Sequence, residues 1–165
     1  IGFRLYLGIE DGLAVLADEV LHVSPYSHLV RTVVATDIAK AYDNVNHEII
    51  LRNTDTLDLP LQVKKLGHSF LTCRTYSIRV DVQKFGSFTS NRGVPQCSVL
   101  APLLFNIAFM PLAYKLEDVE NMRFVIYSDD VTLWSTHRDL EIQCKQLQKG
   151  LDVLHEYVQS NGLQI

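Results

Sequence analysis

Two adjacent carboxylates, Asp129 and Asp130, interrupt a run of apolar residues that would otherwise form strands. Residues 124–127 before them and 131–134 after them are rich in β-branched and aromatic side chains, which predicts a hairpin with the acids at or beside its turn. Ionised carboxylates beside buried strands are costly unless positive charge meets them, and Mg²⁺, which prefers oxygen ligands, supplies such charge. Considered alone, the segment fits an ordinary Asp-Asp surface turn equally well, because Asp is a good turn former.

A third acid, Asp37, follows a predicted buried strand. Residues 32–36 are β-branched and apolar, and a helix is expected from about residue 46. Asp37 lies 92 and 93 residues before Asp129 and Asp130, so only the fold could unite them. United, the three acids could hold two metal ions about 3.5–4 Å apart, the arrangement that serves nucleotidyl transfer.

Composition fits one globular domain and restricts its partners. The chain has 165 residues, of which 47% are hydrophobic, enough for a substantial core. Cys73, Cys97 and Cys144 are odd in number and far apart, which excludes a disulfide framework and a compact zinc site and indicates a reducing intracellular compartment. The net charge of −4 counts against a generic nucleic-acid-binding module, whose surface is normally basic. The longest apolar stretch, residues 99–114, is interrupted by prolines and is too short for a membrane span.

Hydrophobic periodicity predicts an α+β fold. Helices are expected at residues 11–23, 46–57, 61–73 and 98–116, and strands at 76–82 and 85–90 in addition to those beside the acids. A final helix is expected to begin at a capping box formed by Thr136 and Asp139. One face of this helix would carry Leu140, Cys144, Leu147, Leu151, Leu154 and Val158. Because no βαβ repeat is present, we predict an antiparallel sheet backed by helices.

Residues 93–107 closely resemble the GVPQGSVLSPLLFNI signature of reverse transcriptases from non-LTR (LINE-type) retrotransposons. Residues 37–47 resemble that family's DISKAFDxVxH motif, and residues 127–130 resemble its YADD motif. The resemblance continues at residues 161–163 and at residues 2–4 with Asp11, so it runs nearly end to end and in the family's order.

The resemblance implies an RNA-directed DNA polymerase. Such an enzyme adds deoxynucleoside triphosphates (dNTPs) to the 3′-hydroxyl of a DNA primer on an RNA template. Two Mg²⁺ ions, for which Mn²⁺ could substitute, would do most of this chemistry by positioning and charge. It implies that Asp37, Asp129 and Asp130 are the catalytic acids, and that the same side chains together with the Ile38 carbonyl hold the metal ions.

The same resemblance assigns four residues to the incoming nucleotide. The backbone amides of Lys40 and Ala41 would face the triphosphate, while the Lys40 charge stays on the surface. Tyr42 would close the floor of the sugar pocket, where a flat ring excludes a ribose 2′-hydroxyl. Gln96, in a loop with Gly and Pro ahead of a helix, would pack beside the incoming base and sugar.

The resemblance also implies an architecture and a setting. The architecture is a right-hand polymerase palm with part of the fingers, in which residues 1–30 lie on the fingers side and residues 31–165 form mainly palm. A helix and a hairpin are inserted at residues 60–90. Both chain ends look cut, so we expect the thumb, the N-terminal fingers and a possible endonuclease to belong to the rest of a parent polyprotein. A retrotransposon ribonucleoprotein would work in the cytoplasm and the nucleus.

One residue departs from the family pattern at a sensitive position: Cys97 stands where the motif has Gly. A Cβ and a sulfur there would hinder placement of template or nucleotide, and would cost about 1 kcal/mol or more if the position requires a positive φ. A decayed palm remnant that only binds RNA or a partner is therefore one alternative. A group II intron-type reverse transcriptase is another.

Overall fold

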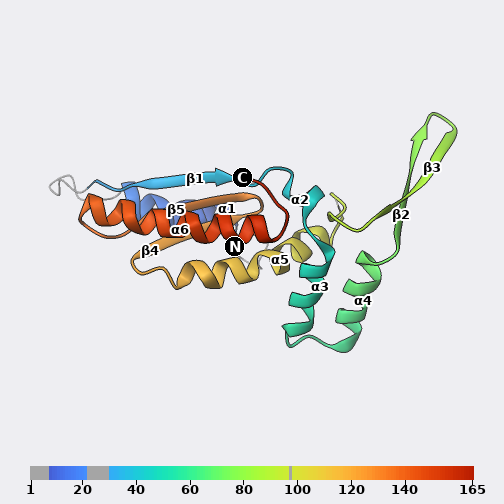
Figure 1. Ribbon diagram of the computed structural model, residues 1–165, viewed down its shortest axis with the longest axis horizontal. Coiled ribbons are helices and arrows are strands. Elements are labelled where there is room, and N and C mark those ends of the chain that lie inside the picture. Colours follow the sequence, from blue (N-terminus) through green and yellow to red (C-terminus); the bar gives the residue numbers. More distant parts are fainter. Residues whose placement is uncertain (1–7, 22–29, 97) are drawn as a thin grey trace.

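A three-stranded antiparallel sheet with helices on both faces forms the centre of the protein, as a computed structural model describes it for residues 8–21, 30–96 and 98–165 (Figure 1). The elements, in chain order, are α1 (Ile9–Leu16), the π-helix η1 (Ala17–Leu21), β1 (Val33–Asp37), α2 (Ala41–Asn44), α3 (His47–Thr56), α4 (Leu61–Leu71), β2 (Arg74–Val80), β3 (Gln83–Ser90), α5 (Ala101–Glu117), β4 (Met122–Tyr127), β5 (Asp130–Ser135) and α6 (Leu140–Ser160). The predicted α+β class is confirmed. Within the described ranges, no helix combines the length and the apolar character that a membrane span needs.

The predicted acidic hairpin is formed by β4 and β5, and β5 is the central strand of the sheet, in the order β1-β5-β4. Tyr127 pairs with Asp130, so Ser128 and Asp129 form a two-residue turn. Ser128 has a φ of 57°, in the positive range that two-residue hairpin turns require. A serine in this conformation costs about 1 kcal/mol, and the paired strands on both sides hold it there.

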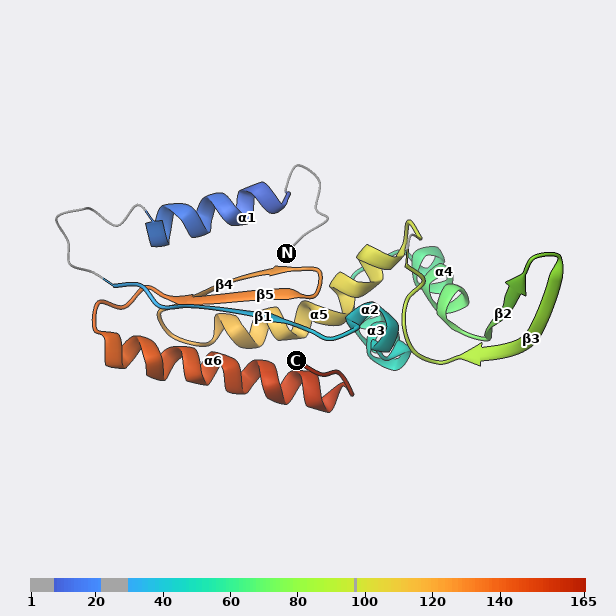
Figure 2. The ribbon, with the colours of Figure 1, turned by 90° about the horizontal axis from the view of Figure 1, so that it is seen from above.

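The main core lies on the face of the sheet that α5 and α6 cover (Figure 2). Val131 and Leu133 of β5 point into this core and are fully buried, because alternate residues of a strand share a face. The intervening residues Asp130, Thr132 and Trp134 face the opposite side, toward α1 and η1. Glu19 of η1 accepts a hydrogen bond from the Trp134 indole nitrogen over 2.8 Å there. The sheet is therefore covered on both faces.

Pro111 inside α5 leaves a main-chain carbonyl to be satisfied by another helix. Proline has no N–H, so the carbonyl of Ile107, four residues earlier, lacks its usual donor. The side-chain amide of Asn53 in α3 donates to this oxygen over 3.0 Å. The hydroxyl of Tyr157 in α6 donates to the next carbonyl, that of Ala108. Because Asn53 and Tyr157 are both buried, three helices are joined at this proline.

Two details predicted for the last helix are wrong. The N-cap of α6 is Asp139, whose carboxylate accepts from the Ile142 amide over 3.1 Å, and Thr136 instead donates to the Asn121 carbonyl. The predicted apolar face is wrong at its start, since Leu140 is 52% exposed and Cys144 is exposed, whereas Leu147, Leu154 and Val158 are buried as predicted.

Gln143 takes the buried place that the pattern assigned to Cys144, and its exposure is 0%. Its side-chain oxygen accepts from the Thr32 amide over 2.9 Å, and its nitrogen donates to the carbonyls of Val30 and His137 over 2.8 Å and 2.9 Å. A buried glutamine is stable only when its polar atoms are paired, and here these bonds fix the chain that leads into β1. Tertiary partners decide this burial, so helical periodicity did not predict it.

The other predicted elements are present with shifted ends. Of the helix expected at residues 11–23, the structure describes α1 and η1, which end at Leu21. The helix expected from Ser98 begins at Ala101, and the Ser98 hydroxyl oxygen accepts from the Ala101 amide over 3.1 Å. The short helix α2 was not predicted, because one turn carries too little periodic pattern. The pair α3–α4 and the hairpin β2–β3 extend beyond the end of the sheet (Figure 1).

Candidate active site

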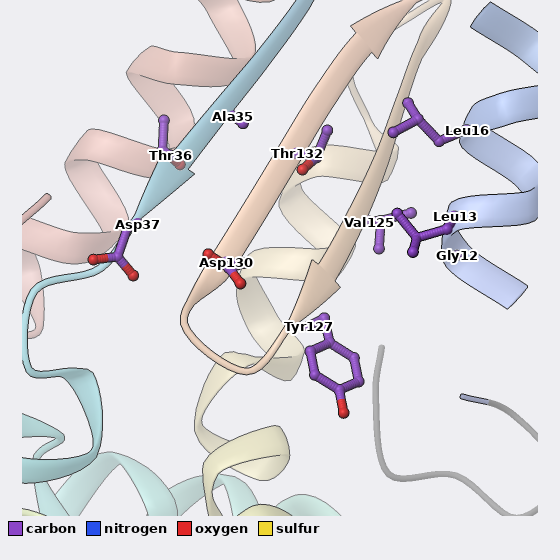
Figure 3. Close-up of a pocket in the computed structure, with 10 residues that line it drawn as sticks. All are labelled: Gly12, Leu13, Leu16, Ala35, Thr36, Asp37, Val125, Tyr127, Asp130 and Thr132. Atoms are coloured by element: carbon purple, nitrogen blue, oxygen red, sulfur yellow. The ribbon is translucent and has the colours of Figure 1, made fainter. Parts of the chain in front are cut away.

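Asp37 and Asp130 lie opposite each other on neighbouring strands. Asp37 ends β1, Asp130 begins β5, and the two are register partners. Such partners have Cα atoms about 4.5–5.5 Å apart and side chains on the same face of the sheet. Both acids are exposed and line a pocket of about 320 Å³ between α1 and the sheet (Figure 3). The structure thus brings together two of the three acids that the sequence singled out.

Asp129 occupies the hairpin turn next to this pair. Its main-chain carbonyl accepts a hydrogen bond from the Ile38 amide over 3.1 Å, which ties the turn to the end of β1. Asp129 lines a different pocket, of about 380 Å³, together with Tyr42 and Gln96. Among residues 8–21, 30–96 and 98–165, no group of three or more His, Cys, Asp and Glu side chains is arranged to hold a metal ion. The three acids therefore share one end of the sheet without forming a closed cluster.

The chemistry of this end of the sheet fits Mg²⁺. In nucleotide sites Mg²⁺ is usually held by one or two carboxylates together with substrate phosphates and water, rather than by a cage of side chains. Asp37 and Asp130 offer two exposed carboxylates at an open pocket, and Asp129 offers a third from the adjoining pocket. Their assignment as metal ligands, with the Ile38 carbonyl, stays a prediction.

The segment after Asp37 turns sharply toward α2. The Ile38 carbonyl accepts from the Ala41 amide over 3.3 Å, and Lys40 between them has a φ of 48°. Non-glycine residues in this conformation are uncommon and often lie at functional sites. The Lys40 side chain is exposed, as predicted. Of the two amides predicted to face the triphosphate, that of Ala41 is engaged with Ile38, although 3.3 Å is long for such a bond.

Tyr42 is held by an aromatic stack. Its ring lies on that of Phe105 in α5, with centroids 4.4 Å apart and planes at 6°, and Phe105 stacks in turn on Phe109. Phe105 and Phe109 are buried, whereas Tyr42 is half-buried and lines the pocket that contains Asp129. The ring therefore reaches this pocket from a rigid support.

The loop that carries Gln96 is fastened to residues 42–47. The Gly93 amide donates to the Val45 carbonyl over 2.8 Å, and the Val94 amide donates to the Tyr42 carbonyl over 2.7 Å. Gly93 has a φ of 75°, and a Cβ at this residue would lie 2.5 Å from the Asp43 carbonyl oxygen, so only glycine permits this approach.

His47 and Asp43, which the sequence did not assign to the site, complete this contact. Nε2 of buried His47 donates to the Gly93 carbonyl over 2.6 Å, and Gln96 donates from its side-chain amide to the Asp43 carboxylate over 3.1 Å. The signal available for both was their position inside the motif at residues 37–47. Cys97 and residues 2–4 lie outside the described residues.

The sequence model described as "Reverse transcriptase (RNA-dependent DNA polymerase)" matches residues 6–165. Over 133 residues the chain is 29% identical to the RNA-directed DNA polymerase from mobile element jockey of Drosophila melanogaster, a match that covers 78% of this chain and 14% of that protein. It is 28% identical over 122 residues to the probable RNA-directed DNA polymerase from transposon BS of the same organism, with 72% and 13% covered. The chain thus corresponds to about one seventh of the length of these relatives.

Solved structures with the same fold include telomerases of Candida tropicalis. Apo telomerase truncated from its C-terminal domain gives a TM-score of 0.65 at 14% identity, over 92% of this chain and 32% of that chain. Telomerase in complex with a fragment of telomeric RNA gives a TM-score of 0.59 at 13% identity, over 90% and 27%. At such low identity the likeness concerns the fold alone.

Proposed function

Because the chain belongs to the reverse transcriptase (RNA-dependent DNA polymerase) family, we propose that it forms the catalytic palm of an RNA-directed DNA polymerase encoded by a non-LTR retrotransposon. The polymerase adds dNTPs to a DNA primer 3′-hydroxyl on an RNA template. The observation that carries this proposal is the pairing of Asp37 with Asp130 at the end of the sheet, beside the pocket of Asp129, Tyr42 and Gln96.

In this proposal the three acids hold the metal ions. Asp37 and Asp130 present their carboxylates on one face, and the hydrogen bond from Ile38 to Asp129 keeps the third acid against them. The Ile38 carbonyl retains a second lone pair for a cation, because its bond to Ala41 uses only one. Bound Mg²⁺, or Mn²⁺ in its place, supplies charge neutralisation and activates the primer hydroxyl.

The residues after Asp37 serve the incoming nucleotide. The left-handed turn at Lys40 leads into α2, and the long bond of the Ala41 amide is weak enough to be exchanged for one to a phosphate oxygen. The stacked ring of Tyr42 forms the floor of the sugar pocket and excludes a 2′-hydroxyl. Gln96 lines the same pocket, and from there its side chain would contact the base and sugar.

The rest of a longer protein would supply what these residues lack. RNA template and DNA primer need a larger surface than one palm, so we propose fingers, thumb and a possible endonuclease in the parent polyprotein. The setting is a ribonucleoprotein in the cytoplasm and nucleus. A decayed remnant remains a second candidate, because Cys97 replaces a motif glycine and the net charge is −4.

Primer extension by the full-length parent tests the proposal. Asp37→Asn and Asp130→Asn remove one carboxylate each at exposed positions, and each should abolish template-dependent extension while thermal unfolding stays unchanged. Glu48→Gln, at an exposed residue of α3 outside both pockets, is the matched control. Cys97→Gly in parallel decides between the candidates: restored extension identifies Cys97 as the defect, and no extension with either residue supports the remnant.

A further inference from the structure

The strand that carries Asp37 depends on its two ends for its position in the sheet. β1 lies at the edge of the sheet and, among the described strands, pairs only with β5. None of its five residues is fully buried, so the burial of one face, which normally specifies the register of a strand, is weak here. A shift of one residue would turn Asp37 to the opposite face of the sheet, away from Asp130. Contacts at the ends of β1 must therefore contribute to the pairing of the two acids.

The segment that leads into β1 is tied to the beginning of α6. The side-chain oxygen of Gln143 accepts a hydrogen bond from the Thr32 amide, and its side-chain nitrogen donates to the Val30 carbonyl. The Arg31 guanidinium donates to two main-chain carbonyls of the loop between β5 and α6, over 2.6 Å and 2.9 Å. Three successive residues ahead of β1 are thereby joined to the loop and the helix that follow β5.

The other end of β1 is tied to the segment that follows α6. The Ala39 amide, two residues after Asp37, donates to the Gln164 carbonyl over 2.8 Å. Leu163 anchors this carbonyl, because its side chain is buried in the main core. Gly162, with a φ of 68°, forms the turn that brings the chain back from α6. Figure 1 shows the C-terminus beside the end of β1, so the residues after α6 reach the turn that follows Asp37.

The length of α6 matches the distance between these two ties. From Thr32 to Ala39 an extended chain spans about 23 Å. From Gln143 to its end at Ser160, the helix rises about 25 Å. Figures 1 and 2 show α6 running alongside β1, while the packing contacts of α6 with the sheet are mainly to β5 and β4. The helix therefore holds β1 chiefly at the two ends of the strand.

We infer that α6 positions Asp37 for the proposed reaction, with Gln143 and Leu163 as the positioning residues. Held at both ends, β1 keeps the place along β5 at which Asp37 lies opposite Asp130. Gln143 acts from a distance, since its partner Thr32 is about 17 Å along the strand from Asp37. The catalytic consequence rests on the proposed function, whereas the hold of α6 on β1 requires no catalysis.

Amide hydrogen exchange in the 165-residue chain, followed by NMR, tests the hold on β1. The measured quantity is the exchange rate of the Ala39 amide divided by that of the Val125 amide, which lies in the hairpin β4–β5. Gln143→Leu should raise this ratio about tenfold or more, because β1 released at its far end opens as a local unit. Leu163→Ala releases the other end and should raise the ratio as well, so it is the second variant if leucine at 143 prevents folding.

The matched control is Leu116→Ala. It removes a fully buried side chain of α5 and destabilises the fold to a similar degree without touching either tie. It should accelerate exchange at both amides through global unfolding and should not raise the ratio.

A cross-link between β1 and β5 separates the position of the strand from the loss of stability. Ala35 and Thr132 are register partners, whose Cα atoms lie within the range of about 4.4–6.8 Å that a disulfide needs. With the three native cysteines replaced by serine, oxidised Ala35→Cys/Thr132→Cys in the Gln143→Leu chain should return the exchange ratio to within about twofold of its original value. The reduced form should not. An unchanged ratio in Gln143→Leu, an equal rise in Leu116→Ala, or no return on oxidation would each overturn the inference.

Primer extension by the full-length parent tests the catalytic consequence and separates this inference from the proposed function. At a temperature where both variants are folded, Gln143→Leu should lower kcat about tenfold more than Leu116→Ala and raise the Mg²⁺ concentration for half-maximal rate, because the paired carboxylates bind the ion less well. Equal losses in the two variants would contradict the inference and leave the function intact. No extension by the parent, with or without Cys97→Gly, together with a raised exchange ratio would contradict the function and leave the hold of α6 on β1 intact.

Discussion

Gln96 and Asp43 are joined across the boundary between two pockets: the Gln96 side-chain amide donates to the Asp43 carboxylate over 3.1 Å. Gln96 lines the pocket of Tyr42 and Asp129 and also a second pocket, of about 530 Å³, which Arg74 and Arg92 line, whereas Asp43 lines only the second. The position of the Gln96 amide therefore depends on a residue that does not itself line the proposed nucleotide pocket.

Replacing Asp43 tests this dependence. In the parent polymerase, Asp43→Ala should lower kcat/KM for dNTPs about fivefold, because the Gln96 amide loses an acceptor that contributes about 1 kcal/mol. Asp43→Asn keeps an acceptor oxygen, so its kcat/KM should fall less. Single-nucleotide extension measures kcat/KM for both variants. Equal losses in the two variants would mean that the charge of Asp43, and not its hydrogen bond, is what matters.

Gly93→Ala should destabilise the fold by about 2 kcal/mol or more. The added Cβ would meet the Asp43 carbonyl at 2.5 Å in a conformation that alanine disfavours. Gly67→Ala is the control, since its Cβ would have only a Thr54 methyl at 4.0 Å and the substitution favours helix α4. Urea unfolding compares the two. A stable Gly93→Ala variant would contradict the close approach of the two segments.

Gln143→Leu should cost about 2–4 kcal/mol of unfolding free energy. It leaves the carbonyls of Val30 and His137 and the Thr32 amide without their side-chain partner in a buried place. Cys144→Ala, one residue along and exposed, should change stability by less than about 0.5 kcal/mol. If chemical unfolding ranked these variants in the reverse order, the burial of Gln143 in place of Cys144 would be contradicted.

Tyr157→Phe should change how stability depends on alkaline pH. Burial raises the pKa of Tyr157 to about 12, and the nearby Arg52 charge lowers this pKa only in part. An unfolded chain loses this proton near pH 10, about two pH units earlier. The contribution of protonated Tyr157 to the free energy of unfolding is therefore complete below about pH 10 and is lost as the pH rises toward about 12. Phenylalanine lacks the proton, so the variant should decline less steeply, while losing about 1 kcal/mol near neutral pH with the bond to Ala108. Identical slopes in pH-dependent unfolding would contradict this assignment.

Tyr42→Val should reduce the preference for deoxynucleotides in an active parent that carries Cys97→Gly. Valine removes the ring that meets a 2′-hydroxyl, and removing a steric block relaxes specificity more readily than it abolishes catalysis. The ratio of kcat/KM for the two nucleotide types is the measurement. Tyr42→Phe keeps the ring and serves as the control. A ratio unchanged by valine would make Tyr42 a packing residue.

The parts of the fold that sequence predicted are those with a local signal. The hairpin around Asp129 and Asp130 and the strand that ends at Asp37 have strong strand patterns, and the motifs beside them indicated that they belong together. The pairing of Asp37 with Asp130 is a matter of strand register between distant segments, which no local pattern specifies. The burial of Gln143 and the contact between Gln96 and Asp43 likewise depend on partners far along the chain. Such partners are visible only once the chain is folded.

The proline in α5 makes the effects of several substitutions depend on one another. The Asn53 side-chain amide stabilises the fold because it donates to the Ile107 carbonyl, which Pro111 leaves without a main-chain donor. An alanine at 111 would return that donor and would make the buried amide of Asn53 superfluous, so a sequence that drifts from proline to alanine tolerates an apolar residue at 53 that the present one rejects. The order in which the two changes arise then decides whether the intermediate folds. Among related sequences, we therefore expect Asn53 to be replaced only after Pro111 has been replaced.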